Sequence, residues 1–121
     1  MNYSELTLRY FRAAPGAGVL AHPTAGRGAA GGVGFGTWVQ FDIEVGEGTI
    51  CDARYLAFGC PHTIAVAAWL VEQAVGGAAR ASLPESVEQL ERRFEIPAAK
   101  RGRILIIEDA WTAAMTAALR R

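Results

Sequence analysis

Residues 38–65 read WVQFDIEVGEGTICDARYLAFGCPHTIA, and the hydrophobic pattern of this stretch decides the fold class. From residue 37 to residue 45 apolar side chains alternate with polar ones, which is typical of a strand with one buried face. Gly46-Glu47-Gly48 supplies a turn, and a second strand is predicted from Thr49 to Phe58. The two strands are therefore expected to form an antiparallel hairpin.

The alternation along the second strand predicts which of its side chains are buried. Cys51, Ala53 and Tyr55 fall on one face, and Asp52 and Arg54 fall on the other. A cysteine among apolar neighbours behaves as a small hydrophobic residue, so Cys51 is expected to be inert packing.

Cys60 stands at the junction between this hairpin and a helix. Gly59 allows the chain to bend, and Pro61 suits the first helical position because it has no N–H to leave unpaired. The run that follows, up to residue 75, is apolar nearly all round and is predicted to be a buried helix that ends at Gly76-Gly77. Free N–H groups and the dipole at a helix N-terminus favour a thiolate, so Cys60 is a candidate reactive thiol.

The rest of the chain predicts more helices and one long loop. Ser4 or Asn2 can cap a first helix, and a Ser82–Glu85 capping box is expected to begin a third. Apolar spacing predicts a last helix. These three further helices are expected over residues 4–12, roughly 83–94 and roughly 104–120.

Residues 14–36 are rich in glycine and are predicted to be a loop. Within them GRGAAG, residues 26–31, matches the G-x-G-x-x-G dinucleotide fingerprint, but the glycines that follow would break the helix this motif needs. The match is interpreted as chance. The fold class predicted for the single domain 1–121 is α+β, a small antiparallel sheet of about three strands with helices packed on one face.

Bulk composition excludes several classes of function. Twelve basic and twelve acidic side chains cancel to a formal net charge of +0, which is unlike a nucleic-acid-binding protein. The N-terminus has no secretory signal, and the most apolar segment, residues 64–75, is shorter than the roughly 20 residues that span a bilayer. Two cysteines make no disulfide scaffold. A soluble cytoplasmic protein is expected, with no membrane or nucleic-acid partner.

The hairpin and the following helix, FDIEV…ICDARYLAFGCPHTIAVAAWLVEQAVGG, resemble the IscU/NifU N-terminal family of iron–sulfur cluster assembly scaffolds. In that family the corresponding run reads approximately I-x-D-A-R-F-x-x-Y-G-C-x-x-x-I-A. NYSELTLRYFRAAPGAG at the start and EDAWTAAMTAAL at residues 108–119 are similar to the opening and closing helices of the family. The resemblance implies an IscU-like fold, a scaffold without enzymatic activity, and partners that include a cysteine desulfurase and an Hsp70-type chaperone. An oligomer is possible.

The family holds its cluster through three cysteines, and the resemblance carries over only one of them, Cys60. The first motif, A-C-G-D, aligns with residues 34–37, where Phe35 replaces the thiol and Thr37 the acid; the third ligand position falls at Arg103. An iron–sulfur cluster normally takes four ligands, so these are degenerate ligand positions. The chaperone-binding motif L-P-P-V-K aligns with Ile96-Pro97-Ala98-Ala99-Lys100, which is the predicted partner-binding segment.

Two functions stay open on these residues. In the first, the protein is an accessory scaffold that handles iron, sulfur, zinc or an iron–sulfur cluster through Cys60. His62 is then a weak second metal ligand, since residues two apart on a helix point about 200° apart, and it is expected to be a partly exposed polar residue. In the second, the protein binds no cofactor and is an interaction module that regulates a desulfurase or chaperone. A thiol enzyme using Cys60 ranks below both.

Overall fold

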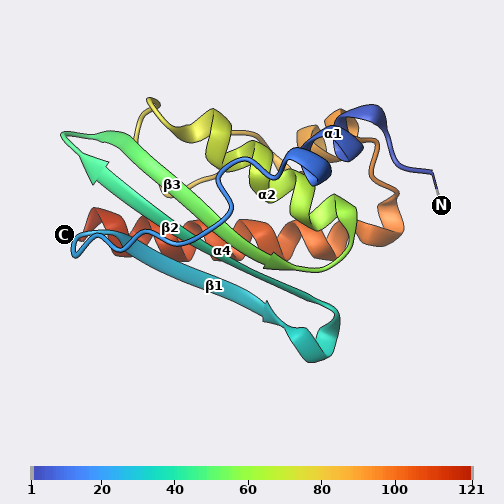
Figure 1. Ribbon diagram of the computed structural model, residues 1–121, viewed down its shortest axis with the longest axis horizontal. Helices are drawn as coiled ribbons and strands as arrows, with labels where there is room; N and C mark the ends of the chain where they lie inside the picture. The colour runs from blue at the N-terminus through green and yellow to red at the C-terminus, as the bar shows by residue number, and fades with distance from the viewer. Residues whose placement is uncertain (1, 121) are drawn as a thin grey trace.

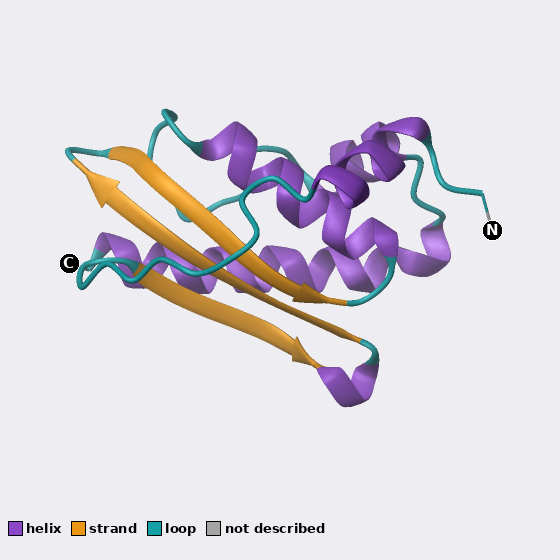
Figure 2. Cartoon of the chain, in the orientation of Figure 1, coloured by secondary structure: helices purple, strands orange, loops and turns teal. Residues whose placement is uncertain are grey.

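The computed structural model describes residues 2–120 and contains one three-stranded antiparallel sheet in the order β1-β2-β3. Helices α2 and α4 pack against one face of the sheet (Figure 1), and Figure 2 shows the separation of strands and helices into two layers. The predicted α+β class is confirmed. The elements are α1 (Glu5–Ala13), β1 (Gly26–Gly32), the short 3-10 helix η1 (Val33–Phe35), β2 (Thr37–Gly46), β3 (Thr49–Phe58), α2 (Pro61–Ala74), α3 (Val87–Phe94), the 3-10 helix η2 (Ala98–Lys100) and α4 (Arg101–Leu119).

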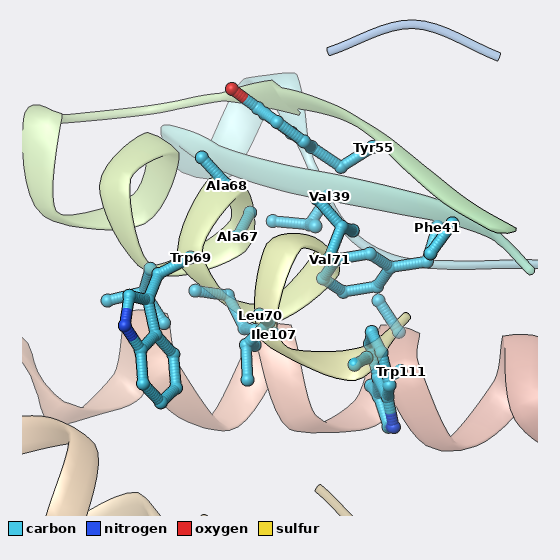
Figure 3. Close-up of a cluster of buried hydrophobic side chains, with 14 of the residues drawn as sticks. Val39, Phe41, Tyr55, Ala67, Ala68, Trp69, Leu70, Val71, Ile107 and Trp111 are labelled. Carbon is cyan, nitrogen blue, oxygen red and sulfur yellow. The ribbon is translucent and has the colours of Figure 1, made fainter. Parts of the chain in front are cut away.

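The core lies between the sheet and the two long helices. Phe41 from β2 meets Trp111 from α4 edge-to-face, with ring centroids 5.1 Å apart, as Figure 3 shows. Trp69 from α2 meets Phe94 from α3 in the same way at 5.9 Å. The first contact joins α4 to the sheet, and the second joins α3 to α2. Helix α2 is buried on almost every side, as its apolar sequence predicts.

The hairpin contains a β-bulge that the alternation did not reveal. Val45 pairs with Ile50 and Glu44 with Asp52, so Cys51 is the extra residue between two pairs. The bulge reverses the alternation locally, which buries Ile50 and leaves Cys51 exposed. The prediction that Cys51 packs inside the protein is therefore wrong.

The predicted loop over residues 14–36 contains a strand, and this part of the prediction is wrong. Residues 26–32 form β1, an edge strand that α4 covers at very short range. A Cβ atom added at Gly26 would lie 2.2 Å from the backbone N of Ala118, and one added at Gly28 would lie 2.2 Å from that of Ala114. The spaced glycines therefore allow a helix backbone to rest on a strand backbone, and they form no nucleotide loop.

Two helix starts also differ from the prediction. Ser86 and Gln89, not Ser82 and Glu85, form the capping box of α3, with Gln89 N donating to Ser86 Oγ at 3.2 Å. Pro84 explains the shift, because the residue before a proline avoids helical backbone angles. Helix α4 begins at Arg101, three residues before the predicted start, whereas Ser4 caps α1 as predicted.

Asp42 is buried although the alternation predicts it on the solvent side of β2. The segment between α1 and β1 crosses that side, and Leu20 N donates to Asp42 Oδ2 at 2.9 Å. Arg27 on β1 donates to both carboxylate oxygens, at 2.8 and 2.9 Å, and the Asp42 side chain is only 1% exposed. Burial raises the pKa of Asp42, but the Arg27 guanidinium and the Leu20 N–H outweigh it and leave the pKa below its ordinary value.

We expect Gly28→Ala to lower the free energy of unfolding by at least about 2 kcal/mol, because the new methyl group collides with the backbone of α4. Urea unfolding followed by circular dichroism measures the change. Gly34→Ala is the matched control: nothing lies within 4 Å of a Cβ there, so its effect should stay within about 0.5 kcal/mol. Equal effects of the two substitutions would contradict the close helix–strand contact.

We expect Asp42→Asn to cost about 2 kcal/mol at pH 7, since the amide cannot replace the charge-assisted bonds from Arg27. The folded-state pKa of Asp42 is lowered, so its contribution is present above the unfolded pKa of about 4 and is lost as pH falls further. The difference from wild type should therefore shrink between pH 5 and pH 2 in urea unfolding. Asp109→Asn, an exposed position on α4, is the control and should change little at either pH.

Candidate functional site

Three segments lie toward the same end of the molecule. The turn η1 between β1 and β2, the start of α2 and the start of α4 all lie at the right-hand end in Figure 1. They carry Phe35, Cys60 and Arg103, which the sequence comparison with the IscU/NifU family places at its three ligand positions. The fold therefore gathers these positions at one end, although only one of them bears a thiol.

Cys60 is the N-cap residue of α2, as predicted. Its backbone is extended (φ −76°, ψ 169°), Ile64 N donates to its carbonyl at 3.3 Å, and Pro61 begins the helix. The side chain is partly exposed, and its Sγ lies 3.7 Å from Thr63 Oγ1. Gly59 permits this approach, because a Cβ there would lie 3.0 Å from the same hydroxyl oxygen.

The environment of Cys60 favours the thiolate. Burial raises the pKa of the thiol, but the backbone N–H and hydroxyl of Thr63, the N–H of His62 and the charge of Lys100 outweigh burial and leave the pKa below its ordinary value. The thiol makes no side-chain capping hydrogen bond, so these N–H groups act on it as nearby dipoles at the N-terminus of α2. A nucleophilic thiol is the chemistry that this arrangement supports.

His62 is buried, with 1% of its surface exposed, so the prediction of a partly exposed residue is wrong. The ring of Tyr3 packs edge-on against it with centroids 4.7 Å apart, and Lys100 Nζ lies 3.4 Å from its Nδ1. Its Nε2 has no hydrogen-bond partner among the described residues. Burial, followed by the charges of Lys100 and Arg103, lowers the pKa of His62 to about 4.

The other positions that the resemblance aligns with the family's first and third motifs carry no thiolate, imidazole or carboxylate. Phe35 projects from η1 with 88% of its side chain exposed, and Thr37 is buried at the start of β2. Arg103 places a cation in the first turn of α4. Within residues 2–120 no three His, Cys, Asp or Glu side chains come together in an arrangement that holds a metal ion. The donor set therefore does not fit an iron–sulfur cluster bound by this chain alone.

A family model for the NifU-like N terminal domain matches residues 2–121. The chain belongs to this family. The resemblance seen in the sequence is thereby confirmed over nearly its whole length.

Two solved structures show the same fold as this NifU-like domain. The N-terminal NifU-like protein from Brucella abortus is 16% identical, with a TM-score of 0.76 over 98% of this chain and 94% of that one. A putative iron–sulfur cluster assembly scaffold protein for the SUF system, from Fervidobacterium islandicum AW-1, is 14% identical, with a TM-score of 0.70 over 94% of each chain. The comparison with curated proteins finds no match.

The segment aligned with the chaperone-binding motif is only partly accessible in this NifU-like domain. Ile96 is buried, and its N–H donates to Glu91 O at 2.9 Å. The side chain of Lys100 turns inward over the ring of Tyr3, 5.2 Å from the centroid. Pro97, Ala98 and Ala99 are exposed. Partner binding by this segment stays a prediction, and the exposed part available for it is residues 97–99.

Sequence reasoning missed three neighbours of the thiol site. Tyr3 carried no signal, because its contact with His62 joins residues far apart in the chain. Lys100 was considered only as part of the chaperone motif, whereas its charge acts on both Cys60 and His62. Thr63 could have been suggested by its position, because the residue three after an N-cap lies back over the cap.

None of the helices in the described part of the chain has the length and apolar character needed to cross a membrane.

We expect the His62 imidazole to stay neutral in the folded protein until the pH falls to about 4. The unfolded chain takes up this proton near pH 6.5, so His62 contributes stability that is present above pH 6.5 and lost between 6.5 and 4, at most about 3 kcal/mol. Long-range ¹H–¹⁵N spectra over this range report the protonation state of the His62 imidazole directly. His62→Phe should remove the corresponding step in stability, and an imidazole that is protonated in the folded protein at pH 6 would refute this assignment.

Proposed function

We propose that this NifU-like protein serves iron–sulfur cluster assembly as a sulfur acceptor, which carries one sulfur atom on Cys60 as a persulfide. Family membership supports the pathway. The observation that carries the proposal is a single thiol at the N-terminus of α2, with its pKa lowered by N–H groups and a lysine. The protein is then a carrier and not an enzyme, because each transfer leaves the sulfur on its own side chain.

Charge and ligand number favour sulfur over metal as the cargo. Lys100 and Arg103 both act electrostatically on this end of the molecule, and positive charge opposes the approach of a metal cation while it stabilises a thiolate or persulfide anion. A pair of chains would contribute two thiolates, which is half of the ligand set of a cluster. The degenerate positions Phe35 and Thr37 add no thiolate or carboxylate to it.

The transfer is an exchange between a thiolate and a donor persulfide. The Cys60 thiolate attacks the outer sulfur of R–S–SH, a new S–S bond forms at Sγ, and the donor S–S bond breaks. The donor leaves as the thiolate R–S⁻, the proton stays on the transferred sulfur, and no net oxidation occurs. A cysteine desulfurase, which holds such a persulfide, is the proposed donor. The N–H groups of His62 and Thr63 would stabilise the attacking and product anions.

A second candidate function is a metal-free interaction module. It is favoured by the apolar side chains that η1 exposes beside the thiol end, Val33 at 61% and Phe35 at 88%. Such exposure in a short turn is typical of a contact surface for another protein. A desulfurase or a chaperone is the proposed partner, with residues 97–99 as a further point of contact.

Sulfur loading tests the first function. The purified protein is incubated with a cysteine desulfurase and free cysteine, and intact mass spectrometry should show a gain of one sulfur atom. Cys60→Ser should abolish the gain, whereas Cys51→Ser, the matched control at the exposed bulge, should retain it. Loading of Cys51, or of neither cysteine, would contradict the proposal.

Two further readouts separate the candidate functions. Stoichiometric iron or zinc in protein purified without oxygen, if it is lost in Cys60→Ser, would show that the protein handles metal through Cys60 and would contradict the sulfur-acceptor proposal. Equal binding of the desulfurase by wild type and Cys60→Ser without sulfur loading would support the interaction module. In that case Phe35→Ser should weaken the binding, because it removes the largest exposed apolar group of η1.

A further inference from the structure

A half-open cavity of about 320 Å³ lies at the C-terminal end of α2, remote from Cys60 at its N-terminal end. The 14 residues of α2 separate the two sites by roughly 20 Å along the helix axis. The walls of the cavity come mainly from the end of α2, from the segment that follows α2, and from α4. The volume is at the lower end of the range for small-molecule pockets, and it accommodates about ten non-hydrogen atoms at roughly 30 Å³ each.

One residue of the lining carries a buried donor that has no partner among the described residues. Trp111 lines the cavity, is only 1% exposed, and its Nε1–H donates to no described residue. Figure 3 shows this nitrogen at the end of the indole that points away from Phe41 and from the sheet. An indole N–H can only donate, and a buried donor left unpaired costs about 1–3 kcal/mol. A ligand acceptor in the cavity would recover that energy.

The other polar groups of the lining complement an anion. Arg80 and Ser82 line the cavity, and neither has an ion-pair or hydrogen-bond partner in the part of the chain that the structure describes. Among the described lining residues none is acidic. The remaining walls include Ile50, Ala74 and Leu83, which suit an apolar body. A charged head that accepts hydrogen bonds and a short hydrocarbon tail match both halves of this lining.

The wall formed by residues 76–79 is held in place before any ligand arrives. Gly76 N donates to Ile50 O at 2.8 Å, Ile50 N to Gly77 O at 2.9 Å, and Ala79 N to Gly48 O at 2.8 Å. These backbone bonds tie the segment to the turn of the hairpin. A preformed wall lowers the ordering cost of binding, which is a general property of small-molecule sites.

We propose that this cavity binds a small organic carboxylate with an apolar body, whose carboxylate accepts hydrogen bonds from the Trp111 indole N–H and the Arg80 guanidinium. The site goes beyond the sulfur-acceptor function and uses none of its residues. The apolar body lies against Ile50 and Leu83, and Ser82 is available to a carboxylate oxygen. The ligand class is set by the chemistry of the lining, which combines hydrogen-bond donors with hydrocarbon.

The test is an NMR titration with 4-methylpentanoate as the probe, followed through the three tryptophan indole N–H signals. The signal of Trp111, identified as the one missing in Trp111→Phe, should shift saturably while those of Trp38 and Trp69 stay in place. Arg80→Gln should weaken the affinity by about tenfold, because a charge-assisted hydrogen bond is lost. Arg12→Gln, an exposed arginine on α1, is the matched control and should leave the affinity unchanged.

Two comparison probes define the chemistry of the ligand. Uncharged 4-methylpentanamide and the tail-less acetate should each bind more weakly than 4-methylpentanoate. The proposal is overturned by the absence of any saturable shift at millimolar probe, by shifts of all three indole signals together, or by binding that Arg80→Gln does not alter. Sulfur loading of Cys60 should be equal in wild type and Arg80→Gln. A negative result in the carboxylate titration therefore contradicts the cavity proposal and has no bearing on the sulfur-acceptor proposal.

Discussion

The contact between the backbone of β1 and the backbone of α4 is the constraint on which the other features of this NifU-like domain depend. It exists because Gly26 and Gly28 present no side chain to the helix, and because alanines face them from α4. Once α4 lies there, its first turn reaches the end of the molecule that carries Cys60, and its middle places Trp111 against Phe41. The end of the molecule that carries Cys60 and the cavity at the other end are thus both positioned by the contact between the glycines of β1 and the alanines of α4.

Burial and charge then give the thiol end its chemistry. The N-terminus of α2 supplies N–H groups to Cys60, and the start of α4 brings Lys100 and Arg103 close enough to act on Cys60 and His62. The Lys100 charge helps to lower the pKa of Cys60, and burial, followed by the charges of Lys100 and Arg103, lowers the pKa of His62 and keeps the imidazole neutral. The same charges that favour an anion at this end work against a metal cation.

Much of the fold was predictable from local patterns, and the reasons are visible in particular residues. The hairpin followed from the alternation along β2, and the position of Cys60 followed from Gly59, which permits a bend, and Pro61, which suits the first helical position. The errors arose where a distant segment decides the outcome. Asp42 is buried by Leu20 and Arg27, and His62 is buried by Tyr3, so neither burial can be read from the neighbouring sequence.

The sequence by itself determined the hairpin, the apolar helix after it and the thiol at the helix start, because each of these depends on residues adjacent in the chain. Only the tertiary structure decided that the glycine-rich stretch is a strand, that Cys51 is exposed at a bulge, that His62 is buried and neutral, and that Trp111 and Arg80 share a cavity. Those outcomes depend on side chains and backbones that approach one another across the fold, and the free energy of such contacts has no signature in a local pattern.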